Sequence, residues 1–160
     1  MSPIVADTTP LNYLVLIEAA ELLPRLYGRV LIPPSVFAEL SHPDAPGEIR
    51  NWALQSREWL RVVQLQSPVD PSLANLDEDE RDAILLAVEQ RAALLLMDER
   101  DGAAVARARN LKVAGTLGVL DVAAARGWID LPAMFAPSAS NFVSAAASPN
   151  DHHARTGCTA

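Results

Sequence analysis

The chain has 160 residues, of which half are hydrophobic and 21% are charged, and this composition is typical of a single folded globular domain. Its 20 acidic and 13 basic side chains give a formal net charge of −7, which argues against a protein that coats nucleic acid. No apolar run approaches the ~18–20 residues of a membrane span. The first residues lack the pattern of a signal peptide, and the single cysteine, Cys158, excludes an intrachain disulfide. We therefore expect a cytoplasmic protein.

The charge is distributed unevenly along the chain. Residues 1–80 carry 12 acidic and 5 basic side chains, whereas residues 81–160 carry 8 of each. An acidic protein can still act on nucleic acid if its carboxylates hold a cation. Twelve of the 13 basic residues are arginine, the side chain that binds phosphate through two parallel hydrogen bonds.

Short apolar runs alternate with helical patterns through the first 76 residues. Pro10 after Thr9 predicts a helix start with Thr9 as the N-cap, and the apolar spacing continues to Ala20 in a unit that ends at Gly28. The other elements predicted in this part of the chain are strands at 4–6, 29–32 and 60–65, helices at 33–40 and 48–58, and loops at 42–47 and 66–76.

The second half continues the alternation. It predicts helices at 77–91, 102–110 and 117–126, strands at 93–97 and 112–114, and a final packed segment at 131–136. Gly127 occupies the position of a C-terminal helix cap. From Pro137 the sequence has no periodicity, so we expect one domain over residues 1–136 and a disordered tail over residues 137–160.

Nearly all-apolar strands that alternate with helices predict an α/β fold, a three-layer α/β/α arrangement with a mostly parallel central sheet. In such sheets the functional site lies beyond the carboxyl ends of the strands. The residues that follow each strand are therefore the first candidates for a site.

Four carboxylates meet this condition. Asp7 directly follows the first strand and Asp98 directly follows the strand at 93–97, while Glu39 and Glu80 lie on helices that adjoin the sheet. Like charges in one pocket require raised pKa values or a bound cation. Oxygen ligands without His or Cys suit Mg²⁺ or Mn²⁺ better than zinc.

Each acid also has a purely structural interpretation. Asp7 could cap the following helix, Glu39 could be an exposed helix residue, and Asp98 could belong to a turn. Asp77 and Glu80 have the spacing of a capping box. However, residues 77–82 include five acids in six positions, and a capping box needs only two.

Five segments in this order resemble the PIN-domain family: IVADTTPLNYL, IPPSVFAEL, LDEDERDAILLA, LLLMDERDGAAVAR and VAGTLGVL. The resemblance covers roughly residues 3–130 and is closest to small prokaryotic PIN-like proteins related to VapC-type toxins. It implies a metal-dependent endoribonuclease with Mg²⁺ or Mn²⁺ as cofactor. The family's four acids map to Asp7, Glu39, Glu80 and Asp98, and its hydroxyl residue maps to Thr8.

Two positions depart from the family pattern. Asp79 stands where related sequences usually have Gly, so Asp79 could share or replace the role of Glu80. The usual Thr-x-Asp is replaced by Met97-Asp98-Glu99, so Glu99 or Asp101 could contribute instead of Asp98.

Two further features suggest contacts with RNA. Gly115–Gly118 could cradle a phosphate or could simply hold a Thr N-cap. Four arginines could guide an RNA backbone or could be solvated helix residues: Arg100, Arg107, Arg109 and Arg126.

The resemblance implies RNA as the substrate and raises the hypothesis of a toxin paired with an antitoxin protein, acting as a homodimer. The alternative is a catalytically inert PIN fold that serves as a partner-binding or dimerisation module. The complete set of four acids argues for the enzyme, because an inert site would tolerate Ala or Asn at these positions.

Overall fold

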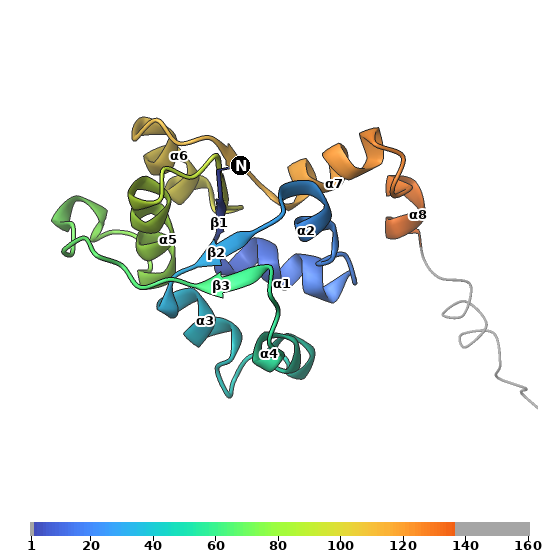
Figure 1. Cartoon of the computed structure of the whole chain (residues 1–160), viewed down its shortest axis with the longest axis horizontal. Coiled ribbons are helices and arrows are strands. Elements are labelled where there is room, and N and C mark those ends of the chain that lie inside the picture. The colour runs from blue at the N-terminus through green and yellow to red at the C-terminus, as the bar shows by residue number, and fades with distance from the viewer. Residues whose placement is uncertain (1, 137–160) are drawn as a thin grey trace, which may run out of the picture.

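The computed structural model describes residues 2–136, and they form a five-stranded sheet in which all neighbouring strands are parallel (Figure 1). The order across the sheet is β3-β2-β1-β4-β5. The strands are β1 (Ile4–Ala6), β2 (Val30–Ile32), β3 (Leu60–Val62), β4 (Leu94–Leu96) and β5 (Val113–Ala114).

Helices cover both faces of this sheet, which confirms the three-layer prediction. The helices are α1 (Thr8–Leu16), α2 (Leu22–Tyr27), α3 (Pro34–Leu40), α4 (Gly47–Leu54), α5 (Glu78–Glu89), α6 (Arg100–Ala108), α7 (Thr116–Ala125) and α8 (Leu131–Phe135), with a short 3₁₀ turn at Pro71–Leu73. None of the helices in residues 2–136 has the length and apolar character needed to cross a membrane.

Alternating side chains of β1, β2, β4 and β5 enter two separate cores. Ile4 and Ala6 of β1 pack with α1, α2, α4 and α7 in one core, and Val5 packs with α5 and α6 in the other. This is the two-residue period of a strand that is buried on both faces. Figure 1 shows α5 and α6 together at one side of the strands and α2 and α7 at the other.

Two predicted boundaries are wrong in the first helical unit. The helix begins at Thr8, so Asp7 rather than Thr9 occupies the N-cap position, and Pro10 is the third helical residue. The predicted segment also divides into α1 and α2, because the chain turns at Glu18, whose φ of 58° lies in the left-handed region. The helix predicted to reach residue 58 ends at Leu54. The predicted tail lies outside the described residues.

The strand order places the ends of β1 and β4 at a topological switch point. β2 and β3, which follow β1 in the chain, lie on one side of it, and the later strands β4 and β5 lie on the other side. Asp7 leaves β1 at this point, and its backbone N–H donates to the carbonyl of Leu96 in β4 at 2.9 Å. Ligands of open parallel sheets bind in the crevice at such a point.

Candidate active site

Asp7 is a buried carboxyl group that does not serve as a helix cap. Only 1% of the residue is exposed, and its Oδ1 has no hydrogen-bond partner. Although Asp7 stands at the N-cap position of α1, its side chain makes no capping hydrogen bond. Pro10, at the third helical position, has no N–H that a cap could satisfy.

The surroundings of Asp7 oppose its ionisation. Burial raises its pKa from 3.8 to about 7, and the backbone N–H of Thr8 partly offsets this rise. The carboxylates of Asp79 and Glu80 raise the pKa further, since a second negative charge close by favours the protonated acid. At neutral pH, a bound proton or a bound cation can therefore offset the unfavourable free energy of burying the Asp7 carboxylate.

A polar cavity of about 390 Å³ adjoins Asp7. Its walls come from the start of α1, from α3 and from the start of α5, and they contain five carboxylates, four neutral polar side chains and no basic residue. The lining residues are Thr8, Thr9, Asn12, Ser35, Glu39, Asp77, Glu78, Asp79 and Glu80. The cavity is therefore suited to a cation.

Unsatisfied buried polar atoms gather at this cavity. Within residues 2–136, the buried side-chain oxygens without a hydrogen-bond partner are Asp7 Oδ1, Thr8 Oγ1, Asn12 Oδ1 and Ser35 Oγ. Three of these residues line the cavity, and the fourth is Asp7. Each buried polar group left unsatisfied costs about 1–3 kcal/mol, so folded proteins seldom leave several together unless something binds there.

Glu80 has two roles in this arrangement. Its side chain accepts a hydrogen bond from the backbone N–H of Asp77 at 3.3 Å, which completes the predicted capping box at the start of α5. Burial raises its pKa, the Asp77 backbone opposes the rise, and the charges of Glu99, Asp77 and Asp79 add to it. Glu80 thus caps α5 and also belongs to the acidic cluster.

Asp98 is held by the start of α7 rather than by the acidic cavity. Its two oxygens accept hydrogen bonds from the backbone N–H of Thr116 at 2.7 Å and from the Thr116 hydroxyl at 2.5 Å. A Cβ on Gly115 would lie 2.4 Å from Asp98 Oδ1, so a glycine is required beside this carboxylate. These contacts give Gly115 and Thr116 a structural explanation, because the N–H that a phosphate cradle would use is already bonded.

Glu99, the neighbour of Asp98, is the acid that this turn brings toward Glu80. Its side chain caps α6 by accepting from the backbone N–H of Gly102 at 2.6 Å, and backbone N–H groups of this helix start hold its pKa below the ordinary value. Its charge acts on Glu80. Asp101 is exposed in the first turn of α6, and Glu39 is exposed at the rim of the cavity.

The structure thus brings Thr8, Glu39 and Glu80 to one cavity with Asp7 beside it, and it places Asp98 in separate contacts. The sequence analysis missed the unsatisfied Asn12 and Ser35. A helical-spacing signal existed for both, because Asn12 lies four residues after Thr8 and Ser35 lies four residues before Glu39. Residues with that spacing share one face of a helix.

The donor set fits a hard divalent cation of the Mg²⁺ type. The available groups are carboxylate, hydroxyl and amide oxygens, with no soft ligand among the lining residues. In residues 2–136, no three Asp, Glu, His or Cys side chains converge closely enough to form a complete cage. Magnesium does not need one, since it is usually held by one or two carboxylates and keeps several water molecules.

Comparison with known proteins supports the same family as the sequence motifs. A family model described as "DUF3368: PIN domain" matches residues 3–136. A solved PilT N-terminus domain protein from the archaeon Sulfolobus solfataricus P2 is similar in structure, with a TM-score of 0.57 and 17% identity over 75% of this chain and 92% of that one. At this identity the likeness shows a shared fold. No curated protein gave a significant match to the sequence.

Proposed function

This chain belongs to the PIN-domain family, a nuclease-type fold, and we propose that it is a metal-dependent ribonuclease whose site is the acidic cavity at the carboxyl edge of the sheet. One observation carries the proposal. The unsatisfied buried oxygens of residues 2–136 belong to this cavity and to the adjoining Asp7.

The proposed ligands are Asp7 and Asp79, with Glu80 close by and Glu39 at the rim. A bound Mg²⁺ or Mn²⁺ would activate water as a nucleophile and neutralise charge on the phosphate. We propose that Asp98 holds the turn between β4 and α6 against the start of α7. Glu99 is then the acid of this turn whose charge acts on Glu80 in the acidic cavity.

The chain's own residues prepare the site in two ways. Asp7, with a pKa of about 7, holds a proton in part of the molecules at neutral pH and releases it when a cation takes that place. The hydroxyls of Thr8 and Ser35 have no protein partner and are available to orient a phosphate oxygen or a water molecule.

The finer parts of the proposal rest on the resemblance of the sequence motifs. They are an RNA substrate, a toxin role with an antitoxin partner, and a homodimer. The family match supports contact with nucleic acid and the use of a divalent metal at the level of the fold.

The second candidate is an inert PIN fold that binds a partner protein. Two observations favour it: no three ligand side chains converge within residues 2–136, and Glu80 and Asp98 both accept hydrogen bonds from helix starts. The same experiment decides between the two functions.

The test is cleavage of total RNA by the purified chain, with EDTA and then with added Mg²⁺ or Mn²⁺. We expect cleavage only with the metal, and we expect Asp7→Asn to lower it on the order of 10²–10³-fold. Asp121→Asn, the same substitution at an exposed position of α7, is the matched control and should cleave like the wild type. Cleavage that survives EDTA, or equal cleavage by Asp7→Asn, would contradict the nuclease site. A folded wild type that cleaves no RNA would favour the inert module.

A further inference from the structure

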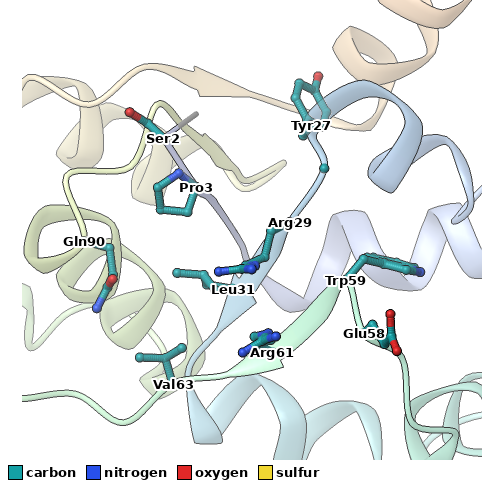
Figure 2. Close-up of a pocket in the computed structure, with 11 residues that line it drawn as sticks. Ser2, Pro3, Tyr27, Arg29, Leu31, Glu58, Trp59, Arg61, Val63 and Gln90 are labelled. Carbon is teal, nitrogen blue, oxygen red and sulfur yellow. The ribbon is translucent and has the colours of Figure 1, made fainter.

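A second cavity lies at the opposite, amino edge of the sheet. With a volume of about 690 Å³, it is lined by residues that precede β1, β2 and β3, by residues on one face of β2 and β3 (Leu31, Arg61 and Val63), and by Gln90 at the end of α5 (Figure 2). We infer that this cavity binds the phosphate backbone of single-stranded RNA through Arg29 and Arg61. The inference rests on the proposed function only for the choice of RNA over DNA.

The parallel register places the two arginines on the same face of the sheet. Arg61 pairs with Leu31, and Arg29 lies two residues before Leu31 on the same strand side. Figure 2 shows both side chains within the cavity beside Leu31. Two guanidinium groups that share one cavity can bind neighbouring phosphates of one strand.

Neither arginine is neutralised within the protein. The ion pairs in the described part of the chain are His42–Asp44 and Arg109–Asp70, so they involve neither Arg29 nor Arg61. Both residues are exposed, and Glu58 is the one carboxylate among the lining residues. The cavity is therefore a local positive site on an acidic protein, which selects an anionic ligand.

Aromatic side chains at the same edge favour a nucleic acid over a small inorganic anion. Trp59 lines the cavity and meets Trp52 at a ring distance of 6.1 Å and an interplanar angle of 54°. Tyr27 lines the cavity as well, and both rings are partly buried against the core on the α1, α2 and α7 side of the sheet. A positively charged groove with aromatic rings is the usual way in which proteins bind single-stranded nucleic acid without reading its sequence.

The two edges are close enough for one RNA molecule to contact both. The strands between them have three residues, which corresponds to roughly 10 Å. An RNA whose scissile phosphate lies at the acidic cavity could therefore be held at a second point by the arginines. In the absence of a cation, the acidic edge would repel the phosphate backbone of the RNA. The arginine edge attracts this backbone whether or not a cation is present.

The experiment measures the binding of a fluorescently labelled single-stranded oligoribonucleotide in EDTA by anisotropy, over a range of KCl concentrations. The double variant Arg29→Ala/Arg61→Ala should bind at least tenfold more weakly, and its salt slope should fall by about 1.4, since each single-strand phosphate contact contributes about 0.7. The variant Arg25→Ala/Arg50→Ala, with one substitution on α2 and one on α4, has the same change in net charge at positions outside the cavity and should bind nearly as well as the wild type. Equal weakening in both double variants would overturn the inference.

Two further arms keep the outcome distinct from the nuclease proposal. Asp7→Asn should retain full binding, so loss of cleavage with retained arginine-dependent binding separates the two sites. Arg29→Lys/Arg61→Lys keeps the charge and should recover part of the affinity, which confirms that loss in the alanine variant is not a folding defect. A mononucleotide that competes as well as the oligonucleotide would overturn the assignment to an RNA strand.

Discussion

The two edges of one sheet differ in both charge and burial. The carboxyl edge gathers five carboxylates around a cavity that no basic side chain lines, and Asp7 beside it is almost completely buried. The amino edge has a larger cavity with two exposed arginines and one carboxylate. The net charge of −7 is an average that describes neither edge. It argues against a protein that coats nucleic acid over its whole surface, but it does not exclude binding at one local positive site.

The difference in burial determines which edge lowers the stability of the folded protein. The carboxyl edge keeps unsatisfied oxygens and a carboxyl group whose ionisation burial opposes, so its metal-free state is destabilised. The arginines at the amino edge stay hydrated, and their charges cost little. Variants at the carboxyl edge should therefore change stability and catalysis, whereas variants at the amino edge should change binding.

The largest expected effect separates catalysis from binding. Asp7→Asn should lower kcat for RNA cleavage on the order of 10²–10³-fold, the magnitude typical of losing one electrostatic contributor to a transition state. Arg29→Ala/Arg61→Ala should raise KM roughly tenfold with little change in kcat, because it removes binding that is equal in the ground and transition states. Steady-state cleavage kinetics measure both. A fall in kcat for the arginine variant as large as that for Asp7→Asn would remove the distinction between the edges.

The next effect concerns the stability of the metal-free protein. Because the pKa of Asp7 is raised from 3.8 to about 7 on folding, the folded state loses stability as the pH rises between these values, by about 4 kcal/mol at most. Asp7→Asn cannot ionise, so in EDTA at pH 8 it should melt roughly 5–10 °C above the wild type. At pH 4 the two proteins should melt at nearly the same temperature. An unchanged or lower melting temperature for the variant at pH 8 would contradict the account, and no change is the result expected of a helix cap, because Asn caps about as well as Asp.

A smaller effect tests the structural role of the β4 side of the carboxyl edge. Gly115→Ala places a Cβ within 2.4 Å of Asp98 Oδ1, so Asp98 or the start of α7 must move. We expect a loss of about 1–3 kcal/mol in the free energy of unfolding, as for other overpacked sites, measured by urea denaturation. Gly118→Ala, whose new Cβ would have its nearest neighbour at 3.4 Å, is the matched control on α7. Equal stability of the two variants would mean that the Asp98–Thr116 contact does not constrain Gly115.

The smallest expected effect shows whether burial or mutual repulsion of the carboxylates destabilises the carboxyl edge. Glu39 lines the same cavity as Asp79 and Glu80, but it is exposed. Its negative charge is therefore hydrated, and Glu39→Gln should change the free energy of unfolding by less than about 0.5 kcal/mol. Denaturation in EDTA at pH 8 gives this value. A gain as large as that of Asp7→Asn would mean that mutual repulsion, rather than burial of Asp7, dominates the edge.

The sequence predicted the features that depend on local patterns. Apolar runs predicted the strands most directly at β1 and β2, which are fully buried and must be apolar on both faces, whereas the edge strand β3 is partly exposed. The Asp77–Glu80 spacing predicted the capping box. The left-handed turn at Glu18 was missed because Glu rarely adopts that conformation and no Gly or Pro indicated a break. The start of α1 was placed two residues late because Pro usually occupies the first helical position.

The site required long-range information that local patterns do not contain. Thr116 lies 18 residues beyond Asp98, and only the placement of β5 beside β4 brings its hydroxyl to that carboxylate. The proximity of Arg29 and Arg61 likewise depends on the register of β2 and β3. The position of Asp7 after an apolar strand was visible in the sequence. Its lack of a cap contact was not, since it depends on where α1 begins.

The most direct test of a metal site at Asp7 is thermal unfolding at pH 8 in EDTA and during a titration with Mg²⁺ or Mn²⁺, for the wild type, Asp7→Asn and Asp98→Asn. A metal that binds only the folded state stabilises it by about 2.7 kcal/mol at a hundredfold excess over the Kd. We expect this stabilisation in the wild type and in Asp98→Asn, with the metal-free melting temperature lowered in the latter by the weakened contact with Thr116. Asp7→Asn should start from a higher melting temperature and lose most of the metal response. No metal response in the wild type, or a full response in Asp7→Asn, would contradict a metal site at Asp7.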